Sequence, residues 1–402
     1  MLKNFWYAIA LKEEVTSTPM RMTVLGQELV LYRDTKNNPV VMSDLCVHRG
    51  GALSEGFLEG DCIRCPYHGW KYKPDGECIE IPANPEGRAI PKKARVDAYP
   101  AVEKYGWIWT FLGDLPEEER IPIPDLPFFD DPTLRRTTGT YEWDVHYARA
   151  LENGIDFAHG AWVHGDAFGN RDEPEIEDYE VDYISELGAS ATINFKPRPA
   201  RGLWRFLYGK NKEVKPVRVT NTWWMPNVSL LEVRLPMGNQ RLFNAHVPVN
   251  ENKTLTKWQL LRDFFTGSWA DKDAARRVVK IFDQDRPMVM GQRPELLPYD
   301  LAAELHVKSD AIQVAYRKTR NKYFDMGWGI DMHTIQAEYA NYQAVVIPSP
   351  ARRENPELAN AWVMKEVPVR GQTMPDDNKL RRAGDPKKSE RRLANGQQEE
   401  SE

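Results

Sequence analysis

Short runs of alternating apolar and polar residues fill the chain from Phe5 to about Leu112. The runs include residues 22–26, 28–32, 40–42 and 106–111. Turn residues such as Gly26 and Asp75-Gly76 separate them. Runs of this length with period-two alternation are typical of β-strands, and glycine and aspartate between them favour tight turns. The pattern therefore predicts a small all-β domain over residues 1–115.

A proline-rich stretch follows, and it predicts a stiff, non-helical connector. Its prolines are Pro116, Pro122, Pro124, Pro127 and Pro132. Beyond them strand-like runs such as 189–195 and 217–224 dominate to about Leu261, and the apolar spacing near Ile281 predicts one long helix over about 270–286. We therefore assign residues 116–370 to a second domain, and the predicted fold class is α+β.

The composition excludes some classes of protein. Lys and Arg number 54 and Asp and Glu 59, so the net charge of −5 provides no basic field for nucleic acid. Hydrophobic residues make up 41% of the chain, enough for a sizeable core, yet no run approaches the roughly 18 apolar residues of a spanning helix. We therefore expect no membrane span and a cytoplasmic location. Residues 371–402 contain no aromatic residue and many charges, which predicts a disordered tail.

Two cysteines and two histidines stand at the spacing of metal ligands. They form the pairs Cys46-Val47-His48 and Cys65-Pro66-Tyr67-His68. Two thiolates on one iron and two imidazoles on the other are the ligand set of a Rieske 2Fe-2S cluster. The same residue types also suit structural zinc, and a scattered set of core residues is the third interpretation. Gly50-Gly51 and Gly69 favour the cluster, because they let the loop backbones pack close to inorganic sulfide.

A second group of candidate ligands lies in residues 152–164. Asp156 and His159 are three residues apart, so a helix would place them on one face. His164 follows five residues later and reaches the same metal if the helix ends near Gly160. Two histidines and one carboxylate with open positions form the facial triad of non-haem Fe(II) oxygenases. The group therefore predicts a mononuclear iron site that needs one more carboxylate.

The predicted helix over about 270–286 supplies two candidates for that carboxylate. Asp285 follows the apolar residues Val278 and Phe282 by seven and three positions, so it points inward with them. Asp283 is turned away by about 200°. We therefore favour Asp285 as the third ligand.

These motifs resemble the α subunits of the Rieske non-haem iron oxygenases over about residues 4–365. The single chain is most similar to the α-only enzymes, such as vanillate and dicamba demethylases, carbazole dioxygenases and chlorophyll-pathway oxygenases. The resemblance implies a Rieske domain followed by a helix-grip catalytic domain, in which an antiparallel sheet wraps over a helix. It also implies a head-to-tail homotrimer, in which the cluster of one subunit faces the iron of its neighbour and Asp156 bridges His68 to His159.

The resemblance further implies a terminal oxygenase. Such an enzyme uses O2 and electrons from NAD(P)H to hydroxylate, dihydroxylate or oxidatively demethylate an aromatic or cyclic substrate. The chain carries no G-x-G-x-x-G fingerprint of a nucleotide site, so a separate reductase or ferredoxin must deliver the electrons. The alternatives are a Rieske electron carrier without oxygenase chemistry and a zinc-stabilised ligand-binding protein.

Two further groups of residues have both a functional and a structural interpretation. Arg49, Arg64, Lys71 and Lys73 surround the Cys/His pairs and either steer an acidic ferredoxin or form a solvated face. Trp223-Trp224-Met225 and Phe243 either line an apolar substrate pocket or pack in the sheet core. Cys62 and Cys78 lie outside the ligand pattern, and we expect them to be buried structural thiols.

Overall fold

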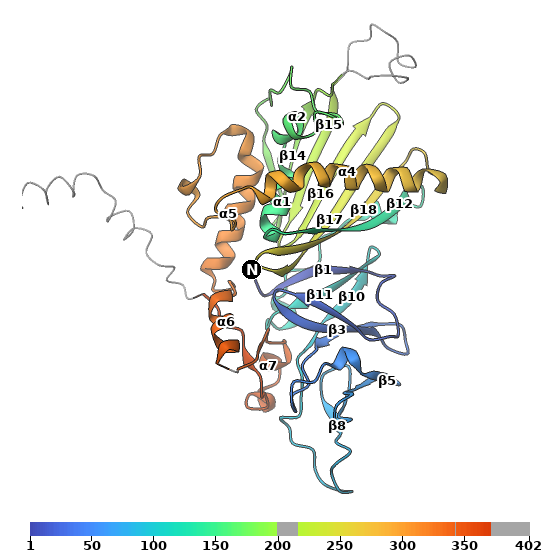
Figure 1. Cartoon of the computed structure of the whole chain (residues 1–402), viewed down its shortest axis with the longest axis vertical. Helices are drawn as coiled ribbons and strands as arrows, with labels where there is room; N and C mark the ends of the chain where they lie inside the picture. Colours follow the sequence, from blue (N-terminus) through green and yellow to red (C-terminus); the bar gives the residue numbers. More distant parts are fainter. Residues whose placement is uncertain (199–215, 342, 371–402) are drawn as a thin grey trace, which may run out of the picture.

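The structure is a computed structural model that describes residues 1–198, 216–341 and 343–370. Figure 1 shows an N-terminal half built from small sheets and a second half built from one large sheet with helices. This arrangement confirms the predicted α+β class, with the all-β part first. The predicted tail at 371–402 lies outside the described residues, and the boundaries near 115 and 370 stay predictions.

The N-terminal half contains three small antiparallel sheets. Their strand orders are β1-β11-β10, β2-β3-β4-β9 and β5-β6-β7-β8. The strands are β1 Phe5–Leu11, β2 Met20–Val24, β3 Gln27–Arg33, β4 Pro39–Ser43, β5 Phe57–Glu59, β6 Cys62–Arg64, β7 Lys71–Tyr72, β8 Cys78–Glu80, β9 Ala98–Tyr99, β10 Ala101–Lys104 and β11 Trp107–Leu112. The predicted strands around Gly26 form the β2–β3 hairpin, and Gly26 adopts a positive φ of 71° in its turn.

The second half is built on a seven-stranded antiparallel sheet with the order β12-β18-β17-β16-β15-β14-β13. The strands are β12 Arg135–Trp143, β13 Val181–Ser185, β14 Gly188–Phe195, β15 Val217–Trp224, β16 Val228–Leu235, β17 Gly238–Asn250 and β18 Lys253–Arg262. A parallel pair, β19 Val345–Val346 and β20 Lys365–Glu366, lies in the C-terminal segment.

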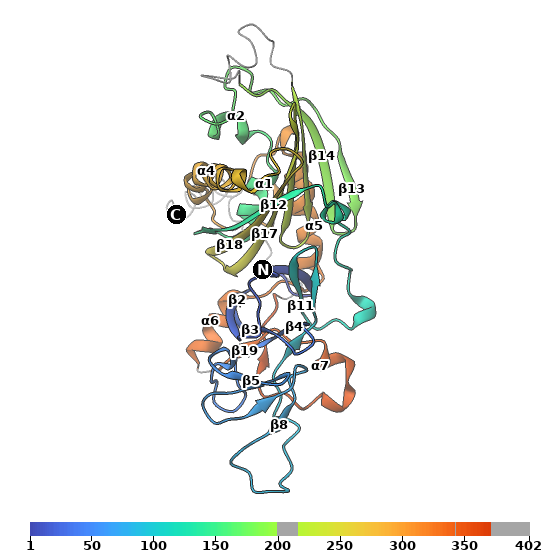
Figure 2. The same cartoon turned by 90° about the vertical axis from the view of Figure 1, so that its right-hand side faces the viewer.

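Helices cover one face of the large sheet. The helices on this face are α1 Tyr147–Ile155, α4 Asp271–Met290 and α5 Ala311–Asp325, and the short α2 His159–Val163 follows α1. Two more helices, α6 Met332–Ala340 and α7 Ala351–Glu354, lie beside the N-terminal half (Figure 1). Short 3₁₀ turns occur at Leu53–Glu55, Glu117–Glu119, Pro127–Asp130, Ser268–Ala270, Leu301–Ala303, Lys308–Asp310 and Pro356–Leu358. The sheet curves around α1 and α4, as the turned view in Figure 2 shows. This is the predicted grip of a sheet on a helix.

The predicted helix over about 270–286 is present, but α4 continues to Met290. Proline at position 287 does not stop it, because the missing N–H removes one hydrogen bond in the last turn only. The carbonyl of Pro287 still accepts a hydrogen bond from the N–H of Gly291 at 3.2 Å. With 20 residues, the helix is long enough to run across the strands of the large sheet (Figure 1).

Buried aromatic residues join the two halves. Trp107 of β11 packs against Phe243 of β17, with ring centroids 5.3 Å apart, and Trp224 belongs to the same buried cluster. The pocket interpretation of Trp224 and Phe243 is therefore wrong, because the first half of the chain covers them. The C-terminal segment also returns to the first half, where buried Arg352 binds both carboxylate oxygens of Asp97 at 2.8 and 2.7 Å.

Among the described residues, we find no helix of the length and apolarity needed to cross a membrane.

Candidate functional site

Two loops of the same shape carry the four Cys/His candidates at the sheet of β5–β8. In the first loop the backbone carbonyl of Cys46 accepts a hydrogen bond from the N–H of Gly50 at 2.8 Å. In the second loop the carbonyl of Cys65 accepts one from the N–H of Gly69 at 3.0 Å. Both glycines have a positive φ, 68° and 73°, which side-chain-bearing residues rarely adopt. The glycines that we singled out from the sequence therefore shape both loops.

The thiols of the two loops are more deeply buried than the imidazoles. Cys46 and Cys65 are both 2% exposed, whereas His48 is half-buried and His68 is exposed. The two imidazole rings lie 4.4 Å apart between centroids. Burial raises the pKa of the Cys46 thiol to about 11, so a bound cation is needed to keep it as a thiolate at neutral pH.

These residues fit a Rieske cluster. Nδ1 of His48 is buried without a hydrogen-bond partner in the described part of the chain, as expected for a ring nitrogen reserved for a metal. Buried thiols and outward imidazoles match the two different irons of such a cluster. Cys78 is 3% exposed, as expected for a structural thiol, whereas Cys62 is only partly buried.

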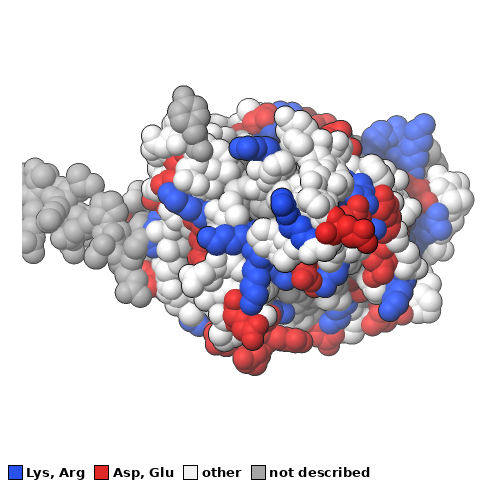
Figure 3. Space-filling view, turned by 90° about the horizontal axis from the view of Figure 1, so that it is seen from below, with Lys and Arg blue, Asp and Glu red and all other residues white. Residues whose placement is uncertain are grey.

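The basic residues around the cluster loops are mostly neutralised. Arg64 binds Glu59 and Glu80, Lys71 binds Glu59, and Lys73 binds Asp75 and Glu77. Figure 3, which views this end of the molecule, shows blue and red side chains interleaved. The solvated-face interpretation therefore holds for Arg64, Lys71 and Lys73.

At the second candidate site, the chain leaves helix α1 at Asp156 and starts helix α2 at His159. Our expectation that these two residues share one face of one helix is wrong. The carboxylate of Asp156 accepts the N–H of Ala158 at 2.8 Å, and this local bond replaces the helical one. Helix α2 then ends at Val163, so the chain turns at His164 and its ring can reach back toward His159.

Three predicted ligands converge behind this break. Nε2 of His164 lies 3.2 Å from Nε2 of His159 and 3.2 Å from Oδ1 of Asp285, and Nε2 of His159 lies 3.5 Å from the same oxygen. Metal–ligand bonds of about 2.1 Å place three ligand atoms at such separations. Oδ1 of Asp285 is buried without a hydrogen-bond partner in the described residues. The set therefore fits a single metal ion, and its two histidines and one carboxylate fit Fe(II).

Asp283 lies elsewhere. Its side chain is on the exposed side of α4 and accepts a hydrogen bond from the hydroxyl of Tyr141 at 2.8 Å. The inward direction of the apolar stripe thus selected Asp285 over Asp283 correctly as the residue that meets the two histidines.

Electrostatics prepare the ring nitrogens for a metal. Burial lowers the pKa of His164 to about 4, so its ring is neutral at pH 7. Burial acts to lower the pKa of His159 as well, but the carboxylate of Asp156, 3.4 Å from Nδ1, outweighs it and raises that pKa. Burial raises the pKa of Asp285 to about 6. A cation at this site therefore relieves a buried carboxylate.

Three amide side chains lie beside these residues, and two of them, Gln284 and Gln313, were not singled out from the sequence. Gln284 meets Nδ1 of His164 at 3.0 Å, while the amide of Asn153 acts to lower the pKa of Asp285 and that of Gln313 of α5 acts to lower the pKa of Asp156. Nothing in the spacing of Gln284 or Gln313 marks them, because their partners come from other elements.

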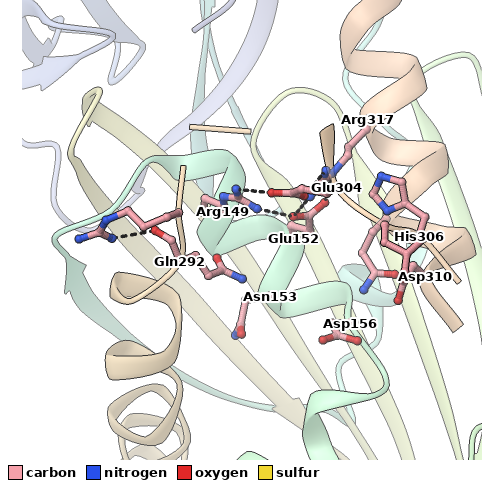
Figure 4. A pocket seen from close by; sticks show the side chains of 12 residues that line it. Arg149, Glu152, Asn153, Asp156, Gln292, Glu304, His306, Asp310 and Arg317 are labelled. Carbon is pink, nitrogen blue, oxygen red and sulfur yellow. Dashed lines mark hydrogen bonds and ion pairs between the residues drawn. The ribbon is translucent and has the colours of Figure 1, made fainter. Parts of the chain in front are cut away.

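A pocket of about 480 Å³ opens beside Asp156. Figure 4 shows Asp156 and Asn153 on one side of it and the charged quartet of Arg149, Glu152, Glu304 and Arg317 on the other. The quartet is closely paired: Arg317 binds Glu152 at 2.5 and 2.7 Å and Glu304 at 2.5 Å, and Arg149 binds Glu304 at 2.8 Å. The approach to Asp156 is therefore polar but nearly charge-balanced.

Comparison with known proteins identifies both halves. The family model for the Rieske [2Fe-2S] domain matches residues 5–103, and that for the vanillate O-demethylase oxygenase C-terminal domain matches residues 143–326. The methylxanthine N1-demethylase NdmA of Pseudomonas putida is 30% identical over 337 residues, which cover 79% of this chain and 88% of NdmA. The match to TsaM1, the iron-sulfur subunit of the toluene-4-sulfonate monooxygenase system of Comamonas testosteroni, is 36% identical but spans 42% of this chain and about half, 48%, of TsaM1.

Solved structures agree with the fold. NdmA of Pseudomonas putida CBB5 with caffeine superposes with a TM-score of 0.68 at 27% identity, covering 79% of this chain and 90% of that one. Dicamba monooxygenase bound to dicamba gives a TM-score of 0.62 at 23% identity and covers 80% of this chain and 97% of that one, which shows a shared fold.

Proposed function

This chain belongs to the Rieske non-haem iron oxygenases, and on that premise we propose that it is a terminal oxygenase acting on an aromatic or cyclic organic substrate. The single observation that carries the proposal is the convergence of His159, His164 and Asp285, whose ligand atoms lie within 4.8 Å of one another in the same chain as the paired Cys/His loops. An electron carrier needs the Cys/His loops but has no use for a second, mononuclear site.

Cys46, His48, Cys65 and His68 would hold the 2Fe-2S cluster, and His159, His164 and Asp285 the Fe(II). When bound, these groups supply the electron transfer and O2 chemistry that side chains lack. Insertion of one oxygen atom of O2 into a C–H bond consumes two electrons and two protons and releases the other oxygen atom as water.

The chain's own residues prepare the site for that chemistry. Burial keeps the His164 ring neutral, and the carboxylate of Asp156, 3.4 Å from Nδ1 of His159, favours a proton on that nitrogen and leaves the Nε2 lone pair for the metal position. The protein therefore contributes ligand geometry and a defined tautomer at each histidine.

A second copy of the chain completes the electron path in this proposal. The β5–β8 sheet, whose loops carry the cluster residues, lies at the opposite end of the molecule from α2 (Figure 1). The imidazole of His68 is exposed, so a neighbouring subunit can contact it. Asp156 lines a pocket beside the candidate iron ligands of the same chain. We therefore expect a head-to-tail homotrimer in which Asp156 bridges His68 of one subunit to His159 of the next. Light scattering should give about three times the 46.4 kDa chain mass; a monomer would contradict the assembly.

The names of relatives support a proposal for the substrate class. NdmA is named for a methylxanthine, TsaM1 for toluene-4-sulfonate, and another relative for dicamba O-demethylation. We propose that this enzyme hydroxylates, dihydroxylates or oxidatively demethylates a ring compound of this kind. Its electrons come from NAD(P)H through a separate ferredoxin or reductase.

The first experiment is metal analysis of anaerobically purified protein, with EPR before and after dithionite. We expect about three irons and two acid-labile sulfides per chain and a reduced signal with an average g below about 2. About two irons and two sulfides would favour the electron carrier, and zinc without sulfide would favour the ligand-binding protein. NADH-driven oxygen consumption with ring compounds then tests turnover.

A further inference from the structure

The two histidines of the mononuclear site differ in what their second nitrogen meets. Nδ1 of His159 faces a carboxylate, that of Asp156, at 3.4 Å. Nδ1 of His164 faces a neutral amide oxygen, Oε1 of Gln284, at 3.0 Å. A carboxylate partner makes an imidazole a stronger metal donor than an amide partner does, because it stabilises positive charge on the ring. The group beside Nδ1 is thus charged at His159 and neutral at His164, which predicts unequal donor strength for the two histidines.

Gln284 reaches His164 because it stands next to Asp285 on α4. One residue of helix rotates the side chain by about 100°, so Asp285 points to the metal position while Gln284 points toward α2. Neighbouring residues on one long helix therefore hold two of the three ligands in a fixed relation. The helix itself is anchored on the sheet through Val278, Phe282 and Val289, all buried.

The His164 ring has few other constraints. Helix α2 has five residues and no side-chain cap, and His164 follows its last residue with φ of −95° and ψ of 26°. Phe168 packs beside the ring at 5.0 Å between centroids, but this contact does not distinguish the two ring nitrogens. Among the described residues, Gln284 is the only hydrogen-bond partner of Nδ1 of His164. The amide oxygen can accept only from a protonated Nδ1, which leaves the lone pair on Nε2.

We propose that Gln284 is a positioning residue of the iron site. Its Oε1 accepts the Nδ1 proton of His164, fixes the ring so that Nε2 faces the metal, and, being neutral, keeps His164 the weaker of the two histidine donors. This inference rests on the proposed function, since it requires a metal at the triad.

Two substitutions test separately the acceptor role and the neutral charge of Gln284. Gln284→Leu removes the acceptor at nearly the same size, and we expect about ten- to hundred-fold weaker binding of Fe(II) at the mononuclear site. Gln284→Glu keeps an acceptor and adds charge, so it should restore affinity to the wild-type value or better. It should also shift the ligand-field absorption of Co(II) bound in place of iron, because the His164 donor becomes stronger. Asp283→Asn, one residue away on the exposed side of α4, is the matched control and should leave both readouts unchanged.

The measurement is a chelator-competition titration of the mononuclear site in the full-length protein with its cluster in place. Thermal unfolding followed by tryptophan fluorescence checks the folding of every variant, and the cluster's EPR signal checks that the cluster is in place. Wild-type affinity in Gln284→Leu, or a Co(II) spectrum in Gln284→Glu identical to that of the wild type, would overturn the inference. If the wild-type protein itself binds no metal at the triad, the proposed function fails instead, so the two failures are distinguishable.

Discussion

The buried residue His246 makes the free energy of unfolding depend on pH, by an amount that follows from its pKa. This residue of β17 is 2% exposed and lies beneath helix α1, where its Nε2 is 3.0 Å from Oγ of Ser229 and its Nδ1 is 2.9 Å from Oγ1 of Thr256. Two hydroxyls satisfy a neutral ring, but no carboxylate lies among the bonded partners to stabilise an imidazolium. Burial therefore lowers the pKa of His246 to about 3.

The sign of the effect follows from proton binding. Between pH 6.5 and about 3 the unfolded chain binds a proton at this residue and the folded chain does not. The stability is complete above pH 6.5 and declines as the pH falls toward 3, with a limiting slope of about 1.4 kcal/mol per pH unit. From pH 7.5 to pH 5, His246 alone should remove about 2 kcal/mol from the free energy of unfolding.

The assay is urea unfolding at about pH 7.5 and 5, followed by tryptophan fluorescence. His246→Gln replaces the ring with an amide that does not titrate, so its loss of stability between the two pH values should be about 2 kcal/mol smaller than that of the wild type. His333→Gln, at an exposed histidine, is the matched control and should lose as much as the wild type. Equal losses in His246→Gln and the wild type would refute the reasoning.

Three further predictions concern the metal sites. Cys65→Ala should abolish the cluster absorption and turnover, because the 2%-exposed thiol has no replacement; a normal cluster spectrum would exclude it as a ligand. Asp156→Asn should retain both metals but slow reduction of the iron by the cluster in single-turnover experiments, and full activity would contradict the bridging role. Gly169→Ala should cost about 1–3 kcal/mol of stability and weaken iron binding, because the new Cβ would lie 2.5 Å from the carbonyl of Gly160 in α2. Unchanged iron affinity in that variant would show that α2 adjusts without moving His164.

The Cys/His loops were readable from the sequence because each contains its ligands and its glycine within a few residues. Local spacing fixes local geometry there, and Gly50 and Gly69 adopt the positive φ that the loop requires. The inward direction of Asp285 could also be predicted from the sequence. Each residue turns a helix by a known angle, and the apolar stripe shows which side of the helix faces the sheet. The break between α1 and α2 could not be predicted from the sequence. A three-residue spacing suits both a continuous helix and the turn in which the Asp156 carboxylate accepts the N–H of Ala158.

Two sets of candidate metal ligands, the order of an all-β and a mixed domain, and the long helix that carries Asp285 were thus predictable from the amino-acid sequence. Each depends on residues close together in the chain or on a single helical period. In contrast, packing between distant elements places Trp224 and Phe243 at the junction of the two halves and brings Gln284 to His164. These contacts join elements far apart in sequence, and their partners are set by how the sheet and helices pack, which no local spacing encodes.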